Sequence, residues 1–98
     1  MRFIIQRDHL VKSVQDVMKA ITSRTTIPIL TGIKIVASEE GVTLTGSDSD
    51  ISIESFIPKE EDDKEIIEIK QPGSIVLQAR FFSDMVRKLP ADFVEIEV

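Results

Sequence analysis

The residues best suited to chemistry lie in a polar segment, residues 23–26, in which one arginine is flanked by hydroxyl side chains. Arg24 carries a permanent positive charge, and the serine and threonines beside it can donate hydrogen bonds. This combination suits contact with phosphate oxygens, because guanidinium and hydroxyl groups are both good donors to an anion. The alternative is that these side chains only solvate a loop and cap its ends.

Residues that could support catalysis are sparse. The single histidine, His9, lies at the start of a predicted helix, and the chain has no cysteine. The four glycines are spread singly, so no glycine-rich phosphate cradle exists. The carboxylates cluster in residues 58–65, PKEEDDKE, where solvation explains them without a catalytic pair. We therefore expect no enzyme, no metal site and no cofactor, and a small hydrolase is the least supported class.

The charge of the chain is unevenly distributed. The net charge of −5 taken alone argues against a nucleic-acid binder. Residues 1–38, however, carry +4, residues 39–69 carry −9, and residues 70–98 are neutral. Such segregation can steer an anion to one surface while another surface repels it. The alternative is that the acidic excess belongs mostly to one loop.

The absence of cysteine excludes a disulfide framework, and no apolar run is long enough to cross a bilayer. We therefore expect a cytoplasmic protein with no membrane partner.

A strand and a helix are expected to lead to Arg24. Residues 3–5 predict a short strand, and Asp8 is placed to cap the helix that follows. The helix buries residues that recur at helical spacing: Leu10, Val14, Val17 and Ile21. Its opposite face carries Lys12, Gln15, Asp16 and Lys19. As a lone pattern, such a face favours simple solvation.

Alternating apolar residues after Arg24 predict three antiparallel strands. The first begins at Pro28, because proline lacks a donor N–H and suits the start of a strand. The following turns and strands are expected at 39–41, 42–45, 46–50 and 51–57. Residues 58–65 should form a charged, solvated loop, and a strand at 66–69 should precede a turn at 71–73.

The next segment repeats the first at an offset of 72 residues. Residues 75–78, IVLQ, match residues 3–6, FIIQ. The helices that follow keep this register in three pairs of apolar residues: Leu10 and Phe82, Val14 and Val86, and Val17 and Leu89. The chain therefore predicts two strand-helix-strands units.

The second unit is shorter than the first. Pro90 ends its helix, and residues 93–98 alternate as one further strand. The first unit has two more strands after its helix, so the last strands of the second are expected to be missing. A strand at the C-terminus leaves an open sheet edge, which favours a fragment over a complete domain. The predicted fold class is α+β.

Four motifs in this order make the chain resemble the N-terminal domain of the bacterial DNA polymerase III beta subunit, the replicative sliding clamp. They are MRFIIQRDHL at 1–10, SRTTIPIL at 23–30, LTGSDSDISIE at 44–54 and ARFFSDMVRKLP at 79–90. The PKEEDDKE loop and the segment QPGSIVLQAR are similar to those of Gram-positive, Bacillus-like clamps. Although no single motif is decisive, their order and spacing together are specific.

The resemblance implies a DNA-clamp fold, with pseudo-symmetric units whose helices lie on one face of an antiparallel sheet. In this family three such domains form a subunit, and two subunits close head to tail into a ring around duplex DNA. Residues 1–98 are then expected to be an incomplete first domain of a homodimeric, non-enzymatic processivity factor. Such a protein would work in the cytoplasm, associated with the nucleoid at replication forks.

The resemblance also implies residue roles. The positions that match DNA-facing residues of the family are Arg24, Lys12, Gln15, Arg80 and Arg87. Phe81 and Met85, on one flank of the second helix, are implied to reach the interface between subunits, and core packing remains the alternative. The family's pocket for the polymerase III alpha subunit and the clamp loader lies in later domains, so those partners should bind outside this chain.

A function from another class stays open at the level of sequence. An independent α+β module could bind a protein partner through its open edge strand. Such a module should form a stable monomer or a small closed oligomer, whereas a cut domain should associate through its exposed edge or fold poorly.

Overall fold

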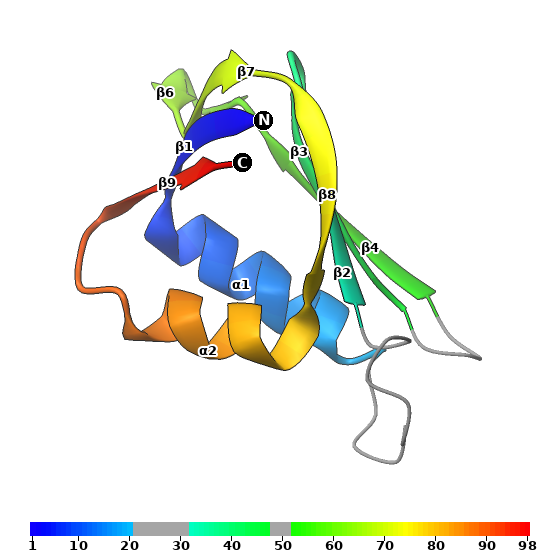
Figure 1. Cartoon of the computed structure of the whole chain (residues 1–98). Helices are drawn as coiled ribbons and strands as arrows, with labels where there is room; N and C mark the ends of the chain where they lie inside the picture. The colour runs from blue at the N-terminus through cyan, green and yellow to red at the C-terminus, as the bar shows by residue number, and fades with distance from the viewer. Residues whose placement is uncertain (21–31, 48–51) are drawn as a thin grey trace.

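The computed structural model describes residues 1–20, 32–47 and 52–98 (Figure 1). Its elements are β1 (Arg2–Gln6), α1 (Arg7–Met18), β2 (Gly32–Ser38), β3 (Gly41–Ser47), β4 (Ser52–Pro58), β5 (Glu60–Glu61), β6 (Lys64–Glu65), β7 (Ile67–Gln71), β8 (Gly73–Gln78), α2 (Ala79–Lys88) and β9 (Phe93–Glu97). The predicted Arg24 segment and the start of the predicted strand at Pro28 lie outside the described residues.

The predicted repeat is confirmed by the backbone. The first residues of α1 and α2, Arg7 and Ala79, are 72 positions apart. Gln6 and Gln78, the residues that precede the helices, have nearly equal dihedral angles, φ −60° and ψ 127° against φ −64° and ψ 123°. Each strand therefore turns into its helix in the same way.

Strands of the two units pair with each other, in addition to the β2–β3–β4 pairing within the first unit. The strand after α1, β2, pairs antiparallel with β8, which precedes α2. The strand after α2, β9, pairs antiparallel with β1, which precedes α1. The registers agree, because Gln78 lies opposite the first residue of β2 and Gln6 lies opposite the first residue of β9. The α+β class is confirmed, with the strands divided between sheets in the orders β7-β1-β9 and β4-β3-β2-β8.

Two local expectations were wrong. Asp8 does not cap α1, because the helix already begins at Arg7 and Gln6 precedes it without a side-chain cap. Residues 58–65 are more ordered than a solvated loop, since β5 and β6 form a hairpin whose turn residues Asp62 and Asp63 have positive φ.

The predicted turn at 71–73 has a role that the sequence did not indicate. β7 pairs with β1 whereas β8 pairs with β2, so at Pro72 the chain crosses from one sheet to the other.

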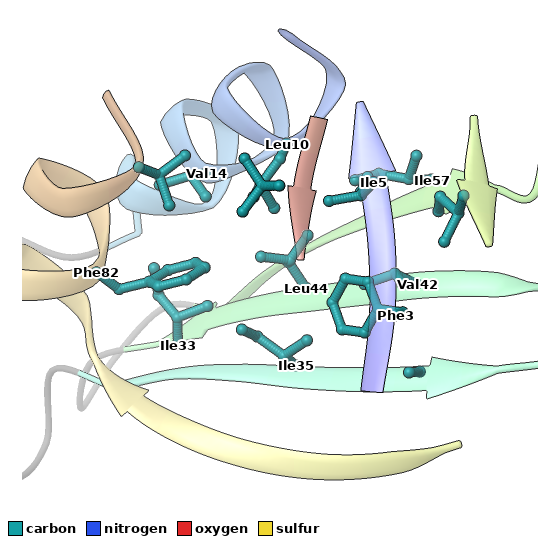
Figure 2. Close-up of a cluster of buried hydrophobic side chains, with 14 of the residues drawn as sticks. Phe3, Ile5, Leu10, Val14, Ile33, Ile35, Val42, Leu44, Ile57 and Phe82 are labelled. Atoms are coloured by element: carbon teal, nitrogen blue, oxygen red, sulfur yellow. The ribbon is translucent and has the colours of Figure 1, made fainter. Parts of the chain in front are cut away.

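One apolar core joins both helices to both larger sheets. Figure 2 shows Leu10 of α1 and Phe82 of α2 pointing toward the strands, where Ile33 and Leu44 meet them. Phe3 of β1 lies in the same cluster. Each of these side chains is at most 1% exposed, and burying one such side chain stabilises the fold by about 1.5–3 kcal/mol.

Gly46 sets how closely α1 approaches the sheet. A Cβ at this position of β3 would lie 2.3 Å from the main-chain oxygen of Val17, near the end of α1. Because that oxygen belongs to the backbone, it could not move aside cheaply. Glycine is therefore required here for the helix to lie directly on β3.

We expect Phe82→Ala to destabilise the chain by about 3–5 kcal/mol, because it removes a ring from the core that both units share. The matched control is Phe81→Ala, which truncates the neighbouring ring, 68% exposed, and should cost about 0.5 kcal/mol or less. Urea denaturation of both variants measures the difference. Equal losses would contradict the assignment of only one of these rings to the core.

Candidate nucleic-acid interface

The two helices lie side by side and run antiparallel, as Figure 1 shows. α1 buries Leu10, Ser13, Val14 and Val17 against the sheets. Lys12 and Gln15 are exposed, on the side of the helix away from this buried stripe. The structure therefore places these two predicted DNA-facing residues on the outer face of the helix pair.

The outer surface of α2 carries the other two predicted DNA-facing residues. Arg80 and Arg87 are exposed and lie seven positions apart, which is about two helical turns, so they share one side of the helix. Asp84 lies between them on the same side, at four positions from Arg80 and three from Arg87. We call Arg80, Asp84 and Arg87 the polar stripe of α2.

The offset of 72 relates the polar stripe of α2 to a stripe on α1. The α1 residues at the equivalent positions are Asp8, Lys12 and Gln15. Because the two helices begin at equivalent residues and their flanking strands pair in the same register, the two stripes occupy equivalent positions. The four predicted DNA-facing residues on the helices thus belong to one pseudo-symmetric surface.

Arg87 is held by two contacts. Its guanidinium Nη2 donates a hydrogen bond of 2.7 Å to Oδ1 of Asp84, and the two side chains are 55% and 59% exposed. Its main-chain carbonyl accepts a 2.7 Å hydrogen bond from Nη2 of Arg7, the first residue of α1. The positive charge of Arg7 at the C-terminal end of α2 also complements the helix dipole. Both the main chain and the guanidinium of Arg87 are therefore held in place by neighbouring side chains.

A similar ion pair occurs near the end of α1. Nζ of Lys19 lies 3.8 Å from Oδ1 of Asp16, and both side chains are largely exposed. In residues 1–20, 32–47 and 52–98, by contrast, Lys12 and Arg80 are in no salt bridge. Lys12 and Arg80 thus differ from Arg87 and Lys19, each of which has an acidic partner three positions before it.

Phe81 and Met85 form a second stripe on α2, and we call it the apolar flank. They are 68% and 44% exposed within the described residues, and their role at the subunit interface stays a prediction, with core packing as its alternative. Met85 is equivalent to Ser13 of α1, which is buried and accepts a 3.0 Å hydrogen bond from the hydroxyl of Ser55 in β4. No described strand gives α2 the cover that β4 gives α1.

The acidic excess lies mostly away from the polar stripes. The β5–β6 hairpin carries Glu60, Glu61, Asp62, Asp63 and Glu65. In Figure 1 the hairpin and α2 lie on opposite sides of β1. A pocket of about 360 Å³ between this hairpin and the start of α1 is lined by Gln6, His9, Glu61, Asp62, Lys64 and Ile66. This mixture of charges differs from the basic outer face of the helices.

The described part of the chain offers neither a metal cluster nor a membrane-spanning helix. No group of three or more His, Cys, Asp or Glu side chains in residues 1–20, 32–47 and 52–98 could hold a metal ion. Neither helix in the same ranges is long and apolar enough to span a bilayer.

The sequence profile of the DNA polymerase III beta subunit, N-terminal domain, matches residues 1–98. The chain belongs to the DNA polymerase III beta-subunit family. The beta sliding clamp of Bacillus subtilis is 78% identical over 98 residues, and that of Halalkalibacterium halodurans is 65% identical over 98 residues. Each match covers 100% of this chain but only 26% of the relative.

Solved structures of the beta-subunit family share the fold. The crystal structure of the Bacillus subtilis sliding clamp matches with a TM-score of 0.94 at 78% identity, covering 100% of this chain and 26% of that one. The Streptococcus pyogenes beta subunit matches with a TM-score of 0.86 at 36% identity, covering 99% and 24%. The predicted resemblance, including its Bacillus-like character, and the predicted clamp fold are confirmed.

Membership of the beta-subunit family leaves the residue roles as predictions. The structure brings Lys12, Gln15, Arg80 and Arg87 onto one pair of helices, whereas Arg24 lies outside the described residues. Sequence reasoning missed the contact of Arg7 with α2, because its partner is 80 positions away and no local pattern indicates it. The pairing of Asp84 with Arg87 was detectable from their spacing of three residues on a helix.

We expect Arg7→Met to loosen the C-terminal turn of α2, because it removes a charged donor from the carbonyl of Arg87. The expected cost is about 1–3 kcal/mol, and amide hydrogen exchange at the end of α2 should accelerate accordingly. Arg2→Met is the control, since Arg2 makes only exposed ion pairs with Glu95 and Glu97, worth about 0–1 kcal/mol. Unchanged exchange in Arg7→Met would contradict this role.

Proposed function

We propose that this chain is the N-terminal domain of a DNA replication processivity factor, a ring-shaped sliding clamp that encircles duplex DNA and tethers the replicative polymerase. The observation that carries this proposal is the match of the whole chain to the family's N-terminal domain. The outer face of the helix pair supports it, because Lys12, Arg80 and Arg87 are exposed on the pseudo-equivalent stripes there. The role is not enzymatic, and the protein works in the cytoplasm at replication forks.

The proposed mechanism is topological. A closed ring cannot leave DNA sideways, so its contacts with phosphates do not have to be strong. Lys12, Gln15, Arg80 and Arg87, together with Arg24, would make weak and partly water-mediated contacts that exchange as the ring moves. The acidic hairpin and the net charge of −5 fit this picture, because acidic surface outside the channel repels DNA.

We infer that the apolar flank of α2 contributes to ring closure. A second copy of the full-length protein would bury Phe81 and Met85. Such burial stabilises the dimer by about 25 cal/mol for each Å² of apolar surface removed from water. The polymerase III alpha subunit and the clamp loader would bind later domains. Their sites lie outside this chain, which spans 26% of the relatives' length.

The independent interaction module has less support. It remains compatible with the edge strand β9, which pairs only with β1 among the described strands. However, both relatives named above match this chain over 26% of their length, as part of a longer beta sliding clamp. A domain of a larger ring is therefore the better explanation of the same exposed edge.

We expect Arg80→Glu in the full-length protein to weaken its loading on primed DNA, because it replaces an attraction to phosphate with a repulsion. The slope of log K for DNA association against log salt concentration should become shallower by about one unit for each phosphate that the variant no longer neutralises. Arg24→Glu should have the same effect. The measurement is the amount of protein loaded on primed circular DNA at several salt concentrations.

Lys70→Glu on β7 is the matched control for these reversals. Lys70 is exposed and its reversal changes the net charge equally, but it lies on the sheet rather than on the helix pair. If Lys70→Glu weakened loading as much as Arg80→Glu, net charge would explain the effect and the assigned face would be wrong.

We expect Phe81→Asp in the full-length protein to raise the dimer dissociation constant at least about tenfold, because a charge replaces an apolar contact at the interface. Analytical ultracentrifugation over a range of concentrations measures it. Phe56→Asp on β4 is the control, since Phe56 is also exposed, at 51%, but lies on another element. If a strand of the same chain covers Phe81 instead, the variant should melt earlier at all concentrations and remain dimeric.

A further inference from the structure

The polar stripe of α2 contains an acid at its centre. Asp84 lies between Arg80 and Arg87, so a phosphate approaching either arginine also approaches a carboxylate. A surface selected only for tight DNA binding would not place a negative charge there, because it repels the phosphate. At the equivalent position, α1 has a base, Lys12. An acid at the central position is therefore particular to the second unit, whereas the acid in the α1 stripe, Asp8, occupies the position of Arg80.

The contacts of Arg87 show what this acid does. The 2.7 Å bond to Asp84 holds the guanidinium along the helix surface, and the 2.7 Å bond from Arg7 fixes the main-chain carbonyl of the same residue. Arg7 thus anchors the backbone of Arg87, while the side chain of Arg87 pairs with Asp84 on the same helix and can exchange that partner for another anion. Both members of the pair are more than half exposed, so water and salt can compete with it.

We propose that Asp84 is a positioning residue that attenuates the grip of Arg87 on DNA. A phosphate must displace the carboxylate to bind the guanidinium, and the carboxylate recaptures the guanidinium when the phosphate leaves. Each contact therefore ends sooner than it would with a free arginine. This inference rests on the proposed function, because it requires the polar stripe to face DNA inside a closed ring.

The attenuation suits movement along DNA. A sliding ring has to release the phosphates it holds before it can hold the next ones, so every strong contact slows it. An acid on the same helix lowers the free-energy difference between Arg87 bound to a phosphate and Arg87 released from it. The positive charge that attracts the DNA is kept. Asp16 and Lys19 at the end of α1 provide a longer and weaker pair of the same kind.

The test uses the full-length protein loaded on DNA and followed by single-molecule tracking. Asp84→Asn keeps the shape of the side chain and removes its charge. We expect its diffusion coefficient at low salt to be about two- to five-fold lower than that of the parent protein, the range typical of an exposed ion pair. The slope of log K for DNA association against log salt concentration should be steeper by about one unit per freed arginine. The diffusion coefficients of the two proteins should converge at high salt, where the charges are screened.

Asp63→Asn is the matched control. It makes the same chemical change and the same change in net charge on the β5–β6 hairpin, and asparagine tolerates the positive φ of 63° found there. Its diffusion should equal that of the parent protein. If Asp63→Asn slowed diffusion as much as Asp84→Asn, the effect would follow from net charge and the proposal would be overturned.

Arg87→Ala separates failure of this inference from failure of the proposed function. If Arg87→Ala speeds diffusion while Asp84→Asn behaves like the parent, Arg87 contacts DNA and the attenuating role of Asp84 is wrong. If neither variant changes diffusion, the polar stripe does not face DNA and both proposals fail for α2. If Asp84→Asn lowers the melting temperature but leaves the salt dependence unchanged, Asp84 only stabilises the helix and the inference is overturned.

Discussion

The reciprocal pairing of two strand-helix units is the constraint on which the rest of the structure depends. β1 needs β9 from the second unit, and β8 needs β2 from the first, so neither unit can complete its sheets alone. Both helices then cover one shared core in which Leu10 and Phe82 occupy equivalent positions. Because the pairing has the same register in both halves, the helices are fixed at equivalent angles to their strands.

This constraint explains why residues far apart in the sequence share one outer face. Lys12 and Gln15 on α1 and Arg80 and Arg87 on α2 lie on stripes that the repeat makes equivalent. The cross-unit contact from Arg7 to the end of α2 adds a polar link between the halves, where the core alone would hold them by apolar packing. The sheets supply rigidity, and the helices carry the side chains available to a partner.

Among the described residues, the flanks of the two helices are covered unequally. α1 is covered on one flank by β4 through Ser13 and Ser55. The matching flank of α2 presents Phe81 and Met85. In the described residues α2 therefore carries an apolar flank beside its polar stripe.

The sequence by itself determined the repeat, the helices and most strands, because apolar periodicity depends on neighbouring residues. It also identified the family, since four motifs keep their order over the whole chain. It could not determine that β7 and β8 belong to different sheets, that residues 58–65 form a hairpin, or that Arg7 reaches Arg87. Only the tertiary structure decided these. The reason is physical: strand partners, long-range hydrogen bonds and the cover of a helix flank depend on segments distant in sequence, which local spacing does not encode.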